Sequence, residues 1–290
     1  MPDIQENRPF WEAFPNMFPN AISEAIGKKI PWHTHAASPQ SSQTFCVSAF
    51  GPLIDHDGSD QICRQLTERS FEDWKHCDGR WKIQLEFSDR VLLNEMMGTP
   101  SQIDVLLDGP DSAITVESKL VVDAQAGFGC CGKFEKSKCK GFYGPGSDAK
   151  SPATWCVLER WDGGRSPRLY WTLGRSFFKP SVFLQQKERE TCPFRGSNYQ
   201  LMRNFLLAAA YSQKKKKKQF GTLVLCPRAF SETLASQVKS FREDVLLPEY
   251  ADRVSLVYYD DYISLLRNSD DDRLGQVAEF LQRRLAAQTM

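Results

Sequence analysis

An alternation of apolar and polar side chains near the end of the first third of the chain predicts a β-strand. From Trp81 to Phe87, aromatic and aliphatic residues alternate with Lys, Gln and Glu, which is the period of a strand with one buried face. Two short apolar runs follow at 103–107 and 113–122, and the second is rich in β-branched residues. The turn-forming sequence Asp-Gly-Pro-Asp separates them. We therefore expect a β-hairpin at 103–122 that pairs with the strand at 81–87.

Apolar residues at helical spacing predict helices on both sides of this hairpin. A short apolar stretch at 45–50 begins after two serines and stops at Gly51-Pro52, so a serine-capped helix is expected there. A second helix is expected at 57–71, and the clearest one lies at 197–211, where apolar residues recur at i, i+3 and i+4. The remaining expected elements are strands at 155–160, 168–173, 220–226 and 254–259 and helices at 231–245 and 274–285.

Charged side chains of the hairpin are predicted to converge at one place. Side chains alternate faces along a strand, so Glu117 and Lys119 share the polar face of the second strand. Folding the hairpin back brings Asp104 close to residues 115–117. Two neighbouring carboxylates repel, and a divalent cation such as Mg²⁺ removes this repulsion because it takes oxygen ligands. The backbone carbonyl of Ser118 would supply a third oxygen.

The order of these residues resembles the motif of the PD-(D/E)XK nuclease superfamily, whose fold is called restriction-endonuclease-like. The matching residues are Asp104, then a turn, then Glu117 and Lys119 on the following strand. Ile103, rather than Pro, precedes Asp104. The resemblance extends over about residues 80–226. A Glu-x-Lys sequence alone is expected about once by chance in a chain of this size, so the match depends on the strand and turn around it.

The resemblance implies an α/β protein with a restriction-endonuclease-like core, in which a central mixed β-sheet is flanked by α-helices. It also implies a metal-dependent nuclease, for which DNA is the expected substrate, although no feature of the sequence selects DNA over RNA. Asp104 and Glu117 would hold Mg²⁺ or Mn²⁺, and Lys119 would assist the attacking water. The alternative is a catalytically silent nucleic-acid-binding or structural protein of the same fold, in which the hairpin carries only a cross-strand salt bridge.

Three further residues are candidates for an auxiliary part in this site. Glu86 lies on the polar face of the first strand and either joins the metal site or is an ordinary solvated residue. Gln200 and Arg203 belong to a polar stripe of the helix at 197–211, which resembles the helix that flanks the active site in several branches of the superfamily. A solvated helix face is the competing interpretation.

Overall charge provides no signature of nucleic-acid binding, since 37 Lys and Arg residues balance 36 Asp and Glu residues. A surface that contacts phosphates must therefore come from local clusters of basic residues. The lysines of residues 133–140, with aromatic residues nearby, and the run of five lysines at 214–218 are the candidates, with solvated loops as the alternative. For the run at 214–218 a solvated loop is the favoured interpretation, and the competing hypothesis is that the two clusters flank the active face and contact phosphates.

Nine cysteines in a chain without a recognisable export signal predict reduced thiols in the cytoplasm. Five of them fall within about 60 residues, and their thiolates offer a possible structural zinc site or iron–sulfur cluster. These five are Cys130, Cys131, Cys139, Cys156 and Cys192. Their spacing does not match a zinc knuckle, so reduced thiols without metal are the favoured interpretation.

The domain organisation expected from these patterns is a single restriction-endonuclease-like domain over residues 1–290. Aromatic residues among prolines predict an irregular arm at about 1–40, and a segment rich in Gly, Lys and Cys at about 123–150 is expected to be a long insertion. No apolar run is long enough for a transmembrane helix, so no membrane partner is expected. Oligomeric state, target sequence and the choice between endonuclease and exonuclease stay open.

Overall fold

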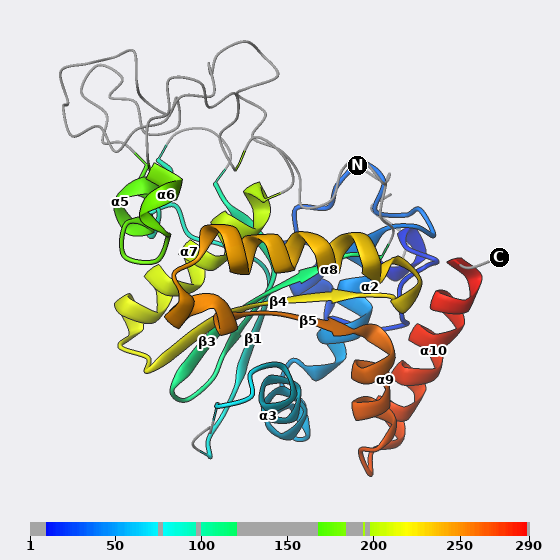
Figure 1. Cartoon of the computed structure of the whole chain (residues 1–290). Helices are drawn as coiled ribbons and strands as arrows, with labels where there is room; N and C mark the ends of the chain where they lie inside the picture. The colour runs from blue at the N-terminus through cyan, green and yellow to red at the C-terminus, as the bar shows by residue number, and fades with distance from the viewer. Residues whose placement is uncertain are drawn as a thin grey trace.

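A five-stranded mixed sheet forms the centre of the computed structural model, which describes residues 10–74, 78–96, 100–120, 168–183, 194 and 198–288 (Figure 1). The strands lie side by side in chain order. They are β1 (Lys82–Ser88), β2 (Gln102–Asp108), β3 (Ser112–Ser118), β4 (Gln219–Cys226) and β5 (Val254–Tyr258). The first three pair antiparallel, and β3, β4 and β5 pair parallel. The predicted fold class, a mixed sheet flanked by helices, is confirmed.

Along the chain, helices lie before, between and after the strands. They are α1 (Glu24–Gly27), α2 (Ser42–Phe50), α3 (Ser59–Ser70), α5 (Tyr170–Gly174), α6 (Pro180–Phe183), α7 (Tyr199–Lys215), α8 (Ser231–Ser240), α9 (Tyr259–Arg267) and α10 (Asp272–Gln288). Within the part of the chain that the structure describes, each helix is too short or too polar to cross a lipid bilayer.

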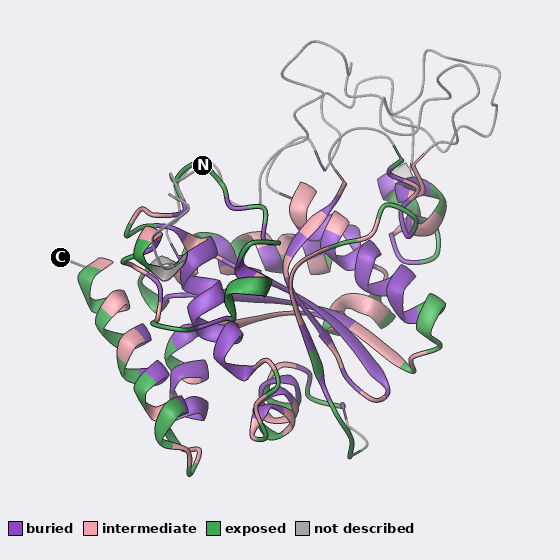
Figure 2. Ribbon diagram, turned by 180° about the vertical axis from the view of Figure 1, so that it is seen from behind, coloured by how far each residue is buried: buried purple, intermediate pink, exposed green. Residues whose placement is uncertain are grey.

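Two apolar layers cover the two faces of the sheet. Helices α5, α7 and α8 cover one face, where Phe205 and Phe241 are completely buried. Helices α2, α3, α9 and α10 cover the other face around Phe45 and Tyr259. Figure 2 shows the buried residues gathered on the sheet and on the helix surfaces that face it. Because helices pack on both faces of the sheet, the ends of the strands are held in place, and so are the side chains that project from those ends.

The residues before α2 pack as an irregular segment against the helix. Phe14 contacts Trp32 with ring centroids 4.3 Å apart, and both side chains are buried in a small third cluster. The side-chain amide of Asn16 donates hydrogen bonds to the carbonyl oxygens of Ala36 and Ser38 and to the hydroxyl of Thr44. These contacts fix the N-terminal end of α2, which lies close to the candidate site.

Most of the elements predicted from the pattern are present, with shifted ends. Helix α2 begins after Ser41, whose hydroxyl caps it by accepting a hydrogen bond from the N–H of Thr44. The prediction of a strand at 168–173 is wrong, because α5 occupies most of that segment. Tyr170, Trp171 and Gly174 are buried together, which is a helical pattern rather than an alternation. The strand expected at 155–160 and the insertion at 123–150 lie outside the described residues.

Candidate active site

The hairpin of β2 and β3 brings Asp104 to the end of β3, as predicted. The two strands pair with Val105 opposite Val116, so Asp104 comes next to Glu117 one position further along. The N–H of Ser118 donates a hydrogen bond of 2.7 Å to Oδ2 of Asp104. Asp104 is therefore held at the carboxyl end of β3, where the paired part of the strand stops.

Glu117 lies at the centre of a set of polar contacts between β3 and α7. Its side chain is 6% exposed, and Oε1 lies 2.9 Å from Nζ of Lys119. Its other oxygen, Oε2, accepts a hydrogen bond of 2.7 Å from Nδ2 of Asn204, which is completely buried. Nζ of Lys119 also donates to Oε1 of Gln200 at 2.8 Å. The structure thus brings Asp104, Glu117, Lys119 and Gln200 together beneath the first turns of α7.

Burial and repulsion make this group of charges costly. Burial raises the pKa of Asp104 well above its usual value, and the nearby charges of Glu117 and Glu86 raise it further. Burial disfavours the ammonium of Lys119, yet the ion pair with Glu117 outweighs it, so the pKa of Lys119 is raised. Lys119 is therefore protonated at neutral pH, and its single positive charge faces two carboxylates.

Glu86 has an unusual backbone conformation for a residue in a strand. Its φ angle is +50°, in the left-handed region that residues with a side chain seldom occupy. The ladder of β1 and β2 pairs Leu85 with Val105 and Phe87 with Ile103, and within this ladder Glu86 and Asp104 form no pair. Residues with such strained backbone angles are found more often at functional sites, where the surrounding structure holds them in place.

Two glutamines hold the Glu86 carboxylate. Nε2 of Gln43, from α2, donates to Oε1 at 2.8 Å, and Nε2 of Gln102, from β2, donates to Oε2 at 2.7 Å. Burial raises the pKa of Glu86 to about 7, and the charge of Glu117 adds to this shift. Glu86 is thus close enough to Glu117 for their charges to interact, and its auxiliary part in a metal site stays a prediction.

The backbone of Ser118 also faces the site. The N–H of Lys119 donates to the carbonyl oxygen of Leu225 on β4 at 2.8 Å. Because the peptide bond is planar and trans, the carbonyl of Ser118 points the opposite way, toward the side of β2 and Asp104. The hydroxyl of Ser118 lies 2.5 Å from the hydroxyl of Tyr259, so the residue is fixed from the other face of the sheet.

Arg203 lies near the site without touching the carboxylates. Its guanidinium lies 5.0 Å from the ring centroid of Tyr199, and its charge opposes the protonation of Lys119. Its Nε atom is buried and has no hydrogen-bond partner among the described residues. The predicted auxiliary pair therefore has two different settings: Gln200 contacts Lys119 directly, whereas the guanidinium of Arg203 packs over the ring of Tyr199.

Two predictions about basic and thiol clusters have different outcomes. The lysine run at 214–218 lies at the far end of α7, about 22 Å along the helix from Gln200, and Lys217 pairs with Asp108 at 2.7 Å. This position contradicts the hypothesis that the run flanks the active face and agrees with the favoured interpretation of a solvated run. Cys130, Cys131, Cys139, Cys156, Cys192 and the lysines of 133–140 lie outside the described residues, so their assignments stay predictions.

Asn204, Gln43 and Gln102 are residues of the site that the sequence predictions missed. Asn204 follows Arg203 and belongs to the same polar stripe of the helix at 197–211, and nothing in the sequence marked it as buried. Gln43 stands between Ser42 and Thr44 in the polar first turn of α2, so the sequence did not single it out. Their partners come from segments distant in sequence, so their contacts depend on how the layers pack.

The mixed sheet, with Asp104 and the Glu-x-Lys pair at the carboxyl end of its central strand β3, places the chain in the restriction-endonuclease-like PD-(D/E)XK superfamily. Residues 5–285 match the family described as "Restriction Endonuclease associating with ARP", and the chain belongs to that family. No curated protein and no solved structure matched the chain.

Proposed function

We propose that this protein is a metal-dependent nuclease that hydrolyses phosphodiester bonds of DNA. The observation that carries the proposal is the arrangement at the carboxyl end of β3, where Glu117 pairs with Lys119 and Asp104 accepts a hydrogen bond from the N–H of Ser118 between them. Membership of a restriction-endonuclease family supports the reaction class. A purely structural salt bridge between Glu117 and Lys119 would not require a second buried carboxylate beside it, because that carboxylate adds repulsion.

The oxygen donors at this site fit Mg²⁺ or Mn²⁺. Among the described residues, no group of three or more His, Cys, Asp or Glu side chains is placed to hold a metal ion. Mg²⁺ does not require such a group, because it is usually bound by one or two carboxylates and keeps several waters. Asp104, Glu117 and the Ser118 carbonyl would hold it. Once bound, the cation lowers the pKa of a coordinated water and offsets charge on the phosphate.

Lys119 would act in this reaction as a positioned positive charge. Its ammonium is fixed by Glu117 and Gln200, and its raised pKa keeps it protonated at neutral pH. A protonated lysine cannot accept the proton of the attacking water. It can orient that water and stabilise the negative charge that develops on the phosphate oxygens in the transition state.

Nicking of supercoiled plasmid by the purified full-length protein tests the proposal. We expect nicking in Mg²⁺ or Mn²⁺, none in EDTA, and strong loss in the Lys119→Ala variant. Lys214→Ala is the matched control, because that lysine lies at the far end of α7 and pairs with Asp89. Wild-type protein that binds DNA but leaves the plasmid intact in both metals would instead support the catalytically silent alternative.

A further inference from the structure

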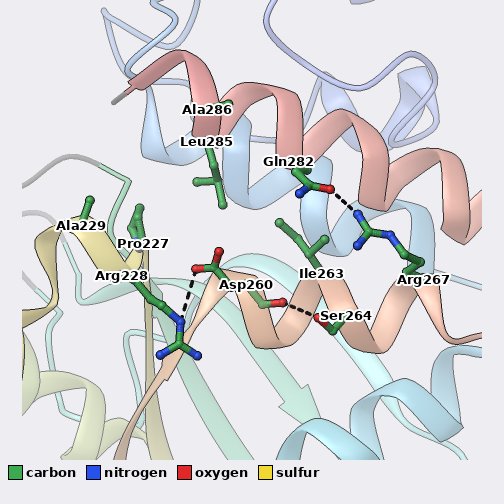
Figure 3. Close-up of a pocket in the computed structure, with 10 residues that line it drawn as sticks. All are labelled: Pro227, Arg228, Ala229, Asp260, Ile263, Ser264, Arg267, Gln282, Leu285 and Ala286. Carbon is green, nitrogen blue, oxygen red and sulfur yellow. Dashed lines mark hydrogen bonds and ion pairs between the residues drawn. The ribbon is translucent and has the colours of Figure 1, made fainter. Parts of the chain in front are cut away.

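A second polar feature lies beyond the ends of β4 and β5. It is a pocket of about 350 Å³ between α9, α10 and the segment that follows β4 (Figure 3). Ile263 and Asp260 extend into it from α9, and Leu285 extends into it from α10. A hydrogen bond between Arg267 and Gln282 joins the two helices at one side of the pocket. Its volume is at the lower end of the range of small-ligand sites.

The pocket and the candidate active site both lie at the carboxyl ends of the parallel strands. In an α/β sheet, ligands bind outside the carboxyl ends of parallel strands. The carbonyl of Leu225, near the end of β4, accepts the N–H of Lys119, and Arg228 follows three residues later at the pocket. Three extended residues span at most about 11 Å. Since DNA advances about 3.4 Å per nucleotide, the pocket is a few nucleotides from the carboxylates.

The lining of the pocket has the chemistry to bind a flat, polar ring. Ile263 and Leu285 supply apolar surface from two sides. Asp260 supplies hydrogen-bond acceptors, since its side chain is 54% exposed and its nearest cation, Nε of Arg228, is 4.0 Å away. The carbonyl oxygen of the Gln282 side chain is engaged by Arg267, which leaves the amide nitrogen of Gln282 as the group that can donate to a ligand.

Arg228 adds a positive charge at the edge of the pocket. Its guanidinium lies 4.2 Å from the ring centroid of Tyr258, and one of its nitrogens, Nη2, pairs with Asp261 at 3.0 Å. Its side chain is 57% exposed. A guanidinium has five N–H donors, so the pair with Asp261 leaves donors for the phosphate of a nucleotide.

We propose that this pocket binds a nucleobase of the substrate strand and prefers a base with an exocyclic amino group. Adenine, cytosine and guanine place an amino group beside a ring or carbonyl acceptor, which matches the carboxylate of Asp260 and the amide of Gln282. Thymine offers a single N–H between two carbonyls, and one of these carbonyls would face the carboxylate. The inference rests on the proposed function, because it takes the ligand to be part of the nucleic-acid substrate.

Saturation-transfer difference NMR on the metal-free full chain tests the pocket, with dAMP, dCMP, dGMP and dTMP as probes. We expect signal on the base protons of dAMP, dCMP and dGMP and about tenfold weaker binding of dTMP. Ala286→Trp fills the pocket from an exposed position of α10 and should abolish the signal. Ala287→Trp, at the next exposed position, does not line the pocket and should leave the signal intact.

The carboxylate has its own matched pair of variants. Asp260→Asn should reduce the preference for amino-bearing bases to near unity, whereas Asp261→Asn, in the same turn but outside the pocket, should preserve it. Gln282→Trp repeats the filling test from another exposed lining position if Ala286→Trp lowers the melting temperature. Equal signals in the wild type and the filled variants would overturn the pocket assignment.

The experiment separates this inference from the proposed nuclease activity. Binding is measured without metal or cleavage, so an inactive wild-type protein would refute the nuclease proposal and leave the NMR result standing. Conversely, if no base binds in the pocket, the pocket proposal fails and the plasmid-nicking test of nuclease activity still stands. A signal that Lys119→Ala removes and Ala286→Trp preserves would come from the carboxylate site and would also overturn the pocket.

Discussion

Glu86→Gln should make the metal-free protein more stable at alkaline pH. The ordinary pKa of a glutamate is 4.5, whereas burial beside Glu117 raises the pKa of Glu86 to about 7 in the folded chain. Between these two values the folded state keeps a proton that the unfolded state has lost. Stability therefore falls as pH rises through this window, and the loss is complete above pH 7.

The size of this effect follows from the difference between the two pKa values. It corresponds to about 3 kcal/mol of unfolding free energy, most of it between pH 5 and pH 7. Glu86 keeps some contact with solvent, which makes this figure an upper bound. The amides of Gln43 and Gln102 remain available to a glutamine at position 86, so the variant removes the charge without emptying the site.

Urea unfolding at pH 5, 6, 7 and 8 measures this effect. Wild-type protein without metal should lose stability across the series, and Glu86→Gln should lose about 2 to 3 kcal/mol less. Glu68→Gln, on the exposed face of α3, should follow the wild type. Added Mg²⁺ should flatten the wild-type curve, because a cation offsets the repulsion. Parallel curves for wild type and Glu86→Gln in the metal-free series would refute the reasoning.

The remaining predictions concern the site and the lysine run. Asp104→Asn and Glu117→Gln should lose Mg²⁺ binding in calorimetry while keeping a wild-type circular dichroism spectrum; unfolding of either variant would indicate a structural cluster. Lys119→Ala should keep Mg²⁺ binding and cleave about 10²- to 10⁴-fold more slowly, and its combination with Asp104→Asn should be little worse than the worse single change. Asn204→Leu removes a donor from Glu117 and should weaken Mg²⁺ binding about 10- to 100-fold, with normal affinity as the contrary result. Alanine at all five lysines of 214–218 should leave the salt dependence of DNA binding unchanged; a flatter slope would place these lysines on the DNA surface.

Local patterns predicted the strands and the Asp104 hairpin because both depend on neighbouring residues. Alternation defined β1, the Asp-Gly-Pro-Asp turn defined the hairpin, and the parity of β3 placed Glu117 and Lys119 on one face. The same reasoning failed at α5. A segment of five residues contains too little periodicity to separate a helix from a strand, and packing against other layers decided its conformation.

The contacts around the carboxylates could not be predicted because they join distant segments. Asn204 reaches Glu117 across 87 positions of the chain, and Gln43 reaches Glu86 across 43. The left-handed backbone of Glu86 had no signal either, since glutamate carries no preference for that conformation. The position of the lysine run stayed open because charge pattern alone does not tell which end of a helix faces the site.

The parallel pairing of β3 with β4 has a consequence for how the chain is made. Residues 119–218, a stretch of 100 residues, separate these two neighbours in the sheet. Closing a loop of that length costs roughly 4 kcal/mol of chain entropy, so the pairing forms late compared with the hairpin. The hydroxyl contact of Ser118 with Tyr259 joins residues 141 positions apart in the chain. A growing polypeptide therefore carries Asp104 and Glu117 on an early hairpin, but α7 and β4 can pack against these carboxylates only after about 100 more residues have been synthesised.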